Sequence, residues 1–230
     1  MAVKQQVRRV PNVRGEGERL RQEILDAATR ILEETGREDA LSLRGVAREV
    51  GISAPSVYLH FKDKTELVAT VLDAAYRALA AAMGEAGEAA AAAGAAPWER
   101  IGATTAAYRR FAIDKPRRYR LMFSLEYEPE RQPSAETPLG TVLQAWTHAV
   151  DTYLAAIAPA RRSEAETVGI HLWTALHGQL VLWHTLPGHH TSSEDILIEL
   201  EQSLLHRLLP IPAPQPSTPT LDAAHSQRGS

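Results

Sequence analysis

The stretch LRGVAREVGISAPSVYLHFKDKTEL, from Leu43 to Leu67, predicts a helix, a glycine turn and a second short helix. Ala47 falls where two helices joined by a tight turn must approach closely, and Gly51 falls at the turn, where the backbone needs a positive φ. The second helix, from about Ala54 to Phe61, is too short to be stable alone, so neighbours must hold it while its outer face remains free. This pattern is typical of a helix-turn-helix, which places its second helix in the major groove of DNA.

Capping and apolar side chains in the same stretch fit this geometry. Ser42 and Ser53 each precede a helical segment and can cap its exposed N–H groups. Pro55 falls in the first turn of the second helix, where a missing N–H costs little. The spacing predicts burial between the two helices for Val46, Val50, Ile52 and Val57.

The segment from Gly51 to Leu67, GISAPSVYLHFKDKTEL, resembles the recognition-helix signature of the tetracycline-repressor (TetR) family of transcriptional regulators. The resemblance rests on Gly51, on the cluster of Tyr58, His60 and Phe61, and on the entry into a following helix at Lys64. One helix precedes the motif in that family, and EILDAATRILEETG supplies it here, so the match covers roughly residues 19 to 67.

The expected DNA-binding residues follow from this resemblance and from the outward face of the second helix. The resemblance implies that the DNA surface is lined by Ser42, Arg44, Ser53, Ser56, Tyr58, His60 and Lys64, and Ala54 and Lys62 complete the set. We expect Lys64 to contact a phosphate rather than a base. The alternatives are a helical subdomain with a solvated polar face, a Tyr58 that only packs, and a His60 that satisfies a backbone carbonyl.

Composition describes an ordinary globular chain of 230 residues, with 44% hydrophobic and 23% charged residues. The sequence has no run of 18 or more apolar residues that would predict a membrane span. The N-terminus also lacks the apolar region of a secretory signal, so we expect a cytoplasmic protein. The absence of cysteine excludes disulfides, thiolate metal sites and thiol nucleophiles. We expect no cofactor and no membrane partner.

Charge is unevenly distributed although the net charge is only −3. Residues 1 to 64 hold 12 Lys and Arg against 10 Asp and Glu, whereas residues 65 to 230 hold 13 against 18. A flexible basic arm at residues 1 to 18 could add salt-dependent contacts to DNA phosphates or a minor groove. A disordered, merely solvating leader is the alternative.

The rest of the chain predicts further helices and no strand, so the expected fold is all-α. A long helix begins at Thr65 and runs to about Ala82, and helices follow from Pro97 and Pro116 and over about 139–157, 163–186 and 193–209. The expected domains are a helix-turn-helix unit at 19–66, an effector-binding and dimerisation bundle at 67–209, and a disordered proline-rich tail at 210–230.

The segment LWTALHGQLVLW resembles the Trp-His-Gly signature of one C-terminal domain class within the TetR family, with Trp173 and His177 on one helical face. Gly178 inside a helix indicates that something approaches closely there. The resemblance implies a helix that takes part in dimerisation and borders an effector cavity. The residues expected to line this cavity for an unknown apolar or aromatic small molecule are Trp98, Tyr108, Phe111, Met122, Phe123, Trp146, Trp173 and His177. The same set also describes an ordinary core.

The last predicted helix has an apolar surface broader than one neighbouring helix would cover, which predicts a homodimer with a four-helix interface and a palindromic operator. The expected interface residues are Ala175, Gln179, Leu182, Ile196, Leu200, Leu204 and Leu208. A monomer whose last helix closes its own core is the alternative.

Two further readings concern chemistry. The cluster of His184, His189 and His190 is a candidate zinc-binding site. It lacks the carboxylate or thiolate that such sites usually contain, so we expect no metal. Arg117, Arg118 and Arg120 could bind an anion or simply cover a short helix. An all-α enzyme is the alternative function, and it would need converging acids, bases or a cofactor motif that the sequence lacks. The sequence therefore predicts a ligand-responsive DNA-binding regulator, most simply a repressor.

Overall fold

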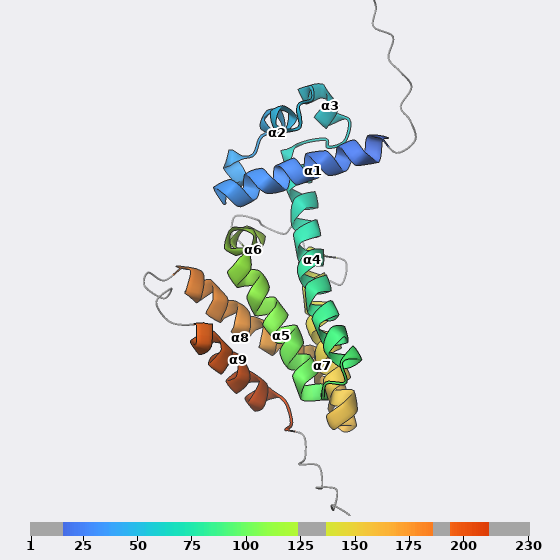
Figure 1. The fold of residues 1–230 in the computed structure, drawn as a ribbon, viewed down its shortest axis with the longest axis vertical. Helices are drawn as coiled ribbons and strands as arrows, with labels where there is room; N and C mark the ends of the chain where they lie inside the picture. Colours follow the sequence, from blue (N-terminus) through green and yellow to red (C-terminus); the bar gives the residue numbers. More distant parts are fainter. Residues whose placement is uncertain (1–15, 124–136, 186–193, 212–230) are drawn as a thin grey trace, which may run out of the picture.

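The computed structural model describes residues 16–123, 137–185 and 194–211, and throughout these ranges the regular structure is helical, as the sequence predicts. Figure 1 shows a small helical head above a longer helical bundle, with α4 running from one into the other. The helices are α1 (Glu16–Thr35), α2 (Leu43–Val50), α3 (Ala54–Tyr58), α4 (Lys64–Ala92), α5 (Pro97–Asp114), α6 (Pro116–Met122), α7 (Pro138–Ile157), α8 (Ala165–Thr185) and α9 (Glu194–Leu208). Short 3-10 turns lie at Glu38–Ala40 and Pro159–Glu164.

The head consists of α1, α2 and α3, with α1 crossing the top of α4 (Figure 1). The buried side of α1 carries Ile24, Ala27, Ala28 and Leu32, a spacing of three and four residues that places them on one helical face. Helix α1 begins at Glu16, so residues 16–18, expected to belong to a flexible arm, are helical. The remainder of that arm lies outside the described residues, as does the expected tail beyond residue 211.

The turn between α2 and α3 has the geometry that the sequence predicts. Gly51 has φ 78° and ψ 27°, in the left-handed region that favours glycine. The N–H of Ile52 donates to the carbonyl of Ala47 at 2.9 Å, and the N–H of Gly51 donates to that of Arg48 at 3.2 Å. This pair of bonds closes the C-terminus of α2 as a Schellman motif and fixes the direction in which α3 leaves.

Helix α4 ends at Ala92, ten residues beyond the expected end near Ala82. Gly84 and Gly87 cost helix propensity, but the helix continues because α4 packs along α5. At Gly87 a Cβ would lie 2.8 Å from Oγ1 of Thr104, so glycine permits this close approach. The helix stops before Gly94, which has φ 80°.

Among the described helices, α4 alone is long and apolar enough to cross a membrane. Its most apolar stretch of 18 residues has a mean hydropathy of 1.3. About half of that stretch, 44%, is buried inside the protein. Its buried side chains, among them Leu67, Leu72 and Leu79, belong to the same core as the neighbouring helices. The apolar character of α4 is therefore accounted for by packing.

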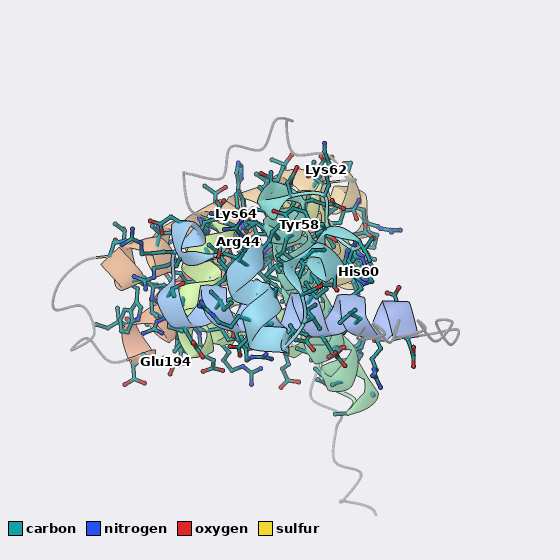
Figure 2. The ribbon with its side chains drawn as sticks, turned by 90° about the horizontal axis from the view of Figure 1, so that it is seen from above. Arg44, Tyr58, His60, Lys62, Lys64 and Glu194 are labelled. Atoms are coloured by element: carbon teal, nitrogen blue, oxygen red, sulfur yellow. The ribbon has the colours of Figure 1, made fainter. Side chains whose placement is uncertain are left out.

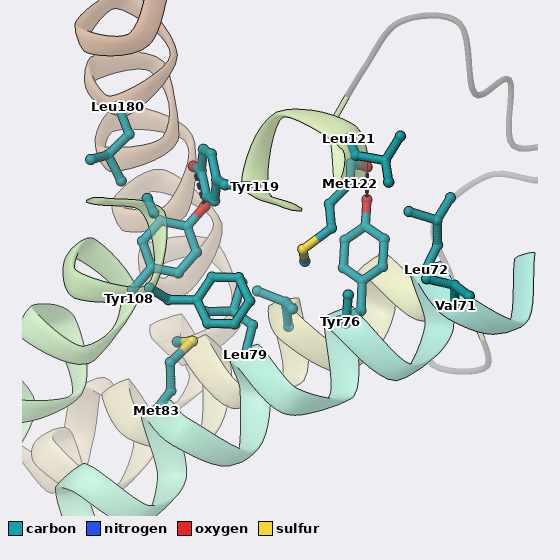
Figure 3. Close-up of a cluster of buried hydrophobic side chains, with 14 of the residues drawn as sticks. Val71, Leu72, Tyr76, Leu79, Met83, Tyr108, Tyr119, Leu121, Met122 and Leu180 are labelled. Carbon is teal, nitrogen blue, oxygen red and sulfur yellow. Dashed lines mark hydrogen bonds between the residues drawn. The ribbon is translucent and has the colours of Figure 1, made fainter. Parts of the chain in front are cut away.

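The bundle is built around α4, α5, α7 and α8, and α9 covers α8 and α5 on the outside (Figure 1). Helices α7 and α8 approach each other closely at Gly169, where a Cβ would lie 3.1 Å from the backbone nitrogen of Thr147. The core of the bundle includes fully buried aromatic rings, namely Tyr108, Tyr119, Trp146 and Tyr153. Figure 3 shows how Tyr76 of α4 reaches α6, where its hydroxyl donates to the carbonyl of Met122.

Candidate DNA interface and effector site

The side chains expected to bind DNA gather on the outer end of the head. Figure 2, seen from that end, shows Arg44, Tyr58, His60, Lys62 and Lys64 together. The exposed members of the whole expected set are Ser42, Arg44, Ser53, Tyr58 and Lys62, while Ala54, Ser56, His60 and Lys64 are half-buried. Val46 and Val57 are fully buried beneath them, so the two helices turn a common apolar side inward.

Three local expectations for this surface need correction, whereas the expected cap at Ser42 is confirmed. Ser42 caps α2 as predicted, since its Oγ accepts a hydrogen bond from the N–H of Gly45 at 3.0 Å. Ser53 does not cap α3: its hydroxyl is hydrogen-bonded instead to the Ser56 hydroxyl at 2.8 Å. Ala54 is half-buried against the core rather than fully outward. Helix α3 ends at Tyr58 rather than Phe61, because Phe61 turns into the core with 1% of its surface exposed.

The junction between α3 and α4 is held by a reciprocal cap. Oδ1 of Asp63 accepts a hydrogen bond from the N–H of Glu66 at 2.9 Å, and the Glu66 carboxylate accepts one from the N–H of Lys62 at 2.7 Å. Lys64 extends from the first residue of α4 and lies 3.8 Å from the Glu38 carboxylate. The pair is partly exposed, so it holds Lys64 only weakly against a competing phosphate.

An exposed apolar residue next to Tyr58 was not predicted. Leu59 has 81% of its surface exposed and Tyr58 has 56%. The sequence could have predicted this exposure, because burial of Val57 and Phe61 leaves Tyr58 and Leu59 pointing outward. An exposed leucine on this face could contact a thymine methyl group in the major groove.

Most of the residues expected to line an effector cavity form one packed aromatic cluster in the bundle. Tyr108 contacts Trp146 with ring centroids 5.4 Å apart, and His177 stacks on Trp173 at the same separation. Phe123 lies 4.3 Å from His177, centroid to centroid. Trp98 is elsewhere: its ring packs against Tyr153 and His206.

The polar centre of this cluster joins three helices. The hydroxyl of Tyr108 on α5 lies 3.0 Å from that of Tyr119 on α6, which lies 2.7 Å from Nδ1 of His177 on α8. Burial raises the pKa of both tyrosines far above the ordinary value and lowers the pKa of His177. All three groups are therefore held in their neutral forms.

Two indole N–H groups in this part of the bundle have no hydrogen-bond acceptor among the described residues. They are Nε1 of Trp146 and Nε1 of Trp173, and both atoms are buried. Burial raises the pKa of Tyr108, and the indole of Trp173 opposes this shift. Trp173 stacks on His177, whose Nδ1 lies 3.4 Å from the Tyr108 hydroxyl, but no hydrogen bond joins the Trp173 N–H to that hydroxyl. A buried donor without an acceptor costs about 1–3 kcal/mol.

Two hollows lie near these elements. A void beside Tyr108, bounded on one side by Leu180 and Leu197, has a volume of about 10 Å³. A larger groove of about 220 Å³ lies between the head and the bundle, with walls from α1, α4 and α6. Its lining includes Leu25, Asp26, Glu33, Val71, Arg118 and Leu121.

Helix α6 is bound to the end of α1 by two arginines that were expected to cover a surface or to bind an anion. Nη1 of Arg117 donates hydrogen bonds to the carbonyls of Glu33, at 3.2 Å, and Glu34, at 2.5 Å. Arg118 forms an ion pair with the Glu33 carboxylate. These carbonyls are at the C-terminus of α1, where backbone acceptors lack intrahelical partners. We call Arg117 and Arg118 the α6 clamp.

Helix α9 is anchored by a buried arginine that was not among the predicted residues. Arg109 of α5 has 9% of its surface exposed, and its Nε lies 3.0 Å from the carboxylate of Glu201, which has 2% exposed. Arg109 also pairs with Glu194, one further residue of α9. Burial raises the pKa of Glu201, and the charge of Arg109 opposes this shift. The seven-residue spacing of Glu194 and Glu201 places both glutamates on one face of α9. This spacing is the feature of the sequence that could have predicted a shared partner.

The outer surface of α8 and α9 carries apolar side chains exposed to solvent in the single chain. Of the residues expected at a dimer interface, Leu182, Ile196 and Leu200 have 55%, 47% and 41% of their surface exposed. Ala175, Gln179, Leu204 and Leu208 are half-buried, and the last two pack against the chain's own core. Further exposed apolar neighbours outside that set are Ile170, Val181 and Ile198. We call Leu182, Ile196 and Leu200 the apolar face.

The environments of Gly178 and His184 limit two other interpretations. A Cβ at Gly178 would meet nothing within 4 Å, so no contact among the described residues requires glycine there. The ring of His184 lies 5.9 Å from that of Tyr119, while His189 and His190 lie outside the described residues. Within the described ranges no three His, Asp or Glu side chains are grouped to hold a metal ion.

Comparisons with known proteins agree on one family. The model for bacterial regulatory proteins of the tetR family matches residues 24–71, and that for the tetracyclin repressor-like C-terminal domain matches residues 101–202. No curated protein sequence matches the chain significantly.

Solved structures show the same architecture. The regulatory protein SCO4313 is 27% identical, with a TM-score of 0.62 over 84% of this chain and 98% of its own. FadR from Bacillus subtilis, solved with stearoyl-CoA, is 15% identical with a TM-score of 0.59, covering 81% and 96%. FadR from Thermus thermophilus, a TetR-family repressor solved with lauroyl-CoA, is 18% identical with a TM-score of 0.53, covering 86% and 100%.

The head has the helix-turn-helix geometry of a DNA-binding domain. Both the head and the bundle of this chain match models of one family. The chain belongs to the TetR family and is a ligand-responsive DNA-binding transcriptional regulator.

Proposed function

We propose that the protein is a homodimeric repressor that is released from a palindromic operator when a small apolar or aromatic effector binds within its C-terminal bundle. The observation that carries this proposal is the position of α6. Its clamp residues contact α1 of the head, while the next residue, Tyr119, is hydrogen-bonded to His177 in the aromatic cluster. A ligand that moves Tyr119 therefore acts one residue away from the contacts that orient the head.

The DNA surface in this proposal consists of the nine expected residues with Leu59 added. Basic side chains such as Arg44 and Lys64 contact phosphates and position the head, while Tyr58 and Leu59 lie on the exposed end of α3 near base edges. The N-terminal arm adds phosphate contacts through its basic residues.

The dimer in this proposal forms through the apolar face. Leucine and isoleucine side chains exposed on two adjacent helices favour burial against a second copy. Packing α8 and α9 of two chains gives a four-helix interface with two-fold symmetry. The two heads would then face successive major grooves, about 34–36 Å apart or a multiple of that.

Effector and operator are coupled in this proposal through α4 and α6. Coupling between two sites is typically about 1–3 kcal/mol, so a saturating effector would lower operator affinity by about 5- to 150-fold. The acyl-CoA complexes of the two FadR structures support a small-molecule effector for this architecture. The C-terminal segment that carries Trp173, His177 and Gly178 would belong to the Trp-His-Gly class.

The test combines DNA binding with a ligand screen. Gel-shift titrations with the DNA upstream of the chain's own gene, at two salt concentrations, should give tight binding that weakens with salt. A thermal-shift screen of metabolites should identify compounds that stabilise the protein, and these should weaken the gel shift. A tight ligand that leaves operator affinity unchanged would refute the coupling for that ligand.

A further inference from the structure

The hydrogen-bond balance of the aromatic cluster specifies the chemistry of its ligand. Tyr108 and Tyr119 each bring one hydroxyl donor, and the order Tyr108 to Tyr119 to Nδ1 of His177 uses both. In that order His177 carries its proton on Nε2 and accepts at Nδ1. The reverse order would leave the Tyr108 hydroxyl hydrogen without an acceptor, so the first arrangement satisfies more of the buried groups.

The indole groups remain outside this chain of hydrogen bonds. We call Trp146 and Trp173 the indole pair. Trp146 is completely buried, and neither indole N–H has an acceptor among the described residues. Trp146 packs against the ring of Tyr108, and Trp173 stacks on His177, whose Nδ1 lies 3.4 Å from the Tyr108 hydroxyl. Both indoles therefore lie near Tyr108, and two buried N–H donors remain without an acceptor among the described residues.

Charge in the ligand would be poorly tolerated here. Arg109 adjoins Tyr108 along α5 but is occupied by Glu194 and Glu201. Burial also opposes protonation of His177, so this ring is a poor positive partner for a carboxylate. A ligand carboxylate would lose its hydration without gaining a positive partner.

We propose that the effector is an uncharged, largely apolar molecule with a carbonyl oxygen, and that this oxygen lies beside Tyr108 and accepts hydrogen bonds from the indole pair. This inference rests on the proposed function, since it assigns the chemical class of the effector. Because the void beside Tyr108 is only about 10 Å³, binding requires the cluster to open. Phe123, Trp173 and His177 are half-buried and form the side of the cluster nearest the surface, so their displacement would admit the ligand.

Three probes that share an aromatic skeleton separate the possible chemistries: acetylnaphthalene, ethylnaphthalene and naphthoate. Their dissociation constants for the full chain are measured by equilibrium dialysis. We expect the ketone to bind about tenfold more tightly than the hydrocarbon, which is the size of one buried hydrogen bond, and the carboxylate to bind most weakly.

Trp146→Phe and Trp173→Phe remove one N–H each and keep an aromatic ring. We expect at least one of these variants to abolish the preference for the ketone. Its affinity for ethylnaphthalene should stay within about twofold of the wild-type value, which shows that only the hydrogen bond to the ketone was removed. Trp98→Phe, which alters a tryptophan outside the cluster, should retain the preference. Circular dichroism confirms that each variant is folded, and two variants keep the test usable if one is not.

Several results would overturn the inference. These are equal binding of ketone and hydrocarbon, tightest binding of naphthoate, no binding of any probe, or an undiminished preference in both indole variants. Operator binding without ligand is measured on the same preparations. A chain that binds its operator but shows one of these results loses only the assigned effector class, whereas a chain that never binds DNA refutes the proposed function.

Discussion

The hydroxyl of Tyr119 and Nδ1 of His177 lie 2.7 Å apart, which joins α6 to α8 through a buried hydrogen bond. Tyr119 follows the two arginines of the α6 clamp in sequence, so the short helix α6 has partners in both domains. A seven-residue helix offers little length over which a displacement could be absorbed. A change at His177 is therefore positioned to alter the contacts at the end of α1.

The buried His177 should make stability depend on pH. Its pKa in the folded protein is lowered below 6.5 by burial, so the unfolded chain binds the proton more readily. The contribution of neutral His177 is complete above pH 6.5 and is lost as the pH falls below 6.5 toward the folded pKa. The melting temperature of His177→Asn, whose amide oxygen can accept in place of Nδ1, should fall less between pH 7 and pH 5 than that of the wild type. His171→Asn, at an exposed position, serves as the control, and identical profiles for all three proteins would contradict the prediction.

Removing the α6 clamp should weaken communication more than binding. Arg117→Ala with Arg118→Ala frees the C-terminus of α1, so the effect of a ligand on operator affinity should decrease by about 5-fold or more, toward no coupling. The ligand's own dissociation constant should change little, because neither arginine belongs to the aromatic cluster. Arg120→Ala, an exposed residue of the same helix, is the matched control. Full retention of coupling in the double variant would exclude the clamp from the mechanism.

Lys64 should contribute to DNA affinity without contributing to sequence preference. In Lys64→Ala the slope of log affinity against log salt should become shallower by about 0.9, the value for one phosphate contact. Specific and random duplexes should lose affinity equally, as fluorescence anisotropy at several salt concentrations can measure. Lys115→Ala, in the bundle, should leave the slope unchanged. An unaltered slope for Lys64→Ala would remove this residue from the DNA surface.

Two glycines of α8 should respond oppositely to alanine. Gly169→Ala places a Cβ 3.1–3.3 Å from backbone atoms of α7, which cannot move independently, so urea denaturation should show a loss of stability of about 1–3 kcal/mol. Gly178→Ala meets open space within the chain and should gain up to about 1 kcal/mol from helix propensity. A loss of dimer affinity in Gly178→Ala would instead show that a second copy approaches this position.

Charges on the apolar face should prevent dimerisation. Leu182→Glu with Leu200→Glu introduces carboxylates at residues that are exposed in the single chain, so the fold should remain intact while sedimentation shifts from dimer to monomer. Operator binding should weaken by at least tenfold, because two linked heads bind more tightly than one. Leu59→Glu, at an exposed leucine of the head, should remain dimeric. A wild-type chain that sediments as a monomer at micromolar concentration and still binds the operator tightly would refute the dimer.

Sequence alone determined the helix-turn-helix, because its signals are local. Gly51 occurs where the turn requires a residue in the left-handed conformation, and Ser42 caps the helix that follows it. Val46 and Val57 are spaced so that both side chains are buried between the two helices. The all-α class followed in the same way from helical periodicity. Local rules were less reliable where a side chain had a choice of partner, as for Ser53, whose hydroxyl bonds to Ser56.

Only the tertiary structure decided which distant residues meet. Tyr108, Tyr119 and His177 belong to three helices, and nothing local indicates that their polar groups converge in the core. The bonds from Arg117 to the end of α1 span more than 80 residues, as does the pairing of Arg109 with Glu201. Helical periodicity gives the buried face of each helix but not its neighbour, because the angle and order of packing depend on every helix in the bundle. The head could therefore be predicted from the sequence, whereas the contacts between the head and the bundle could not.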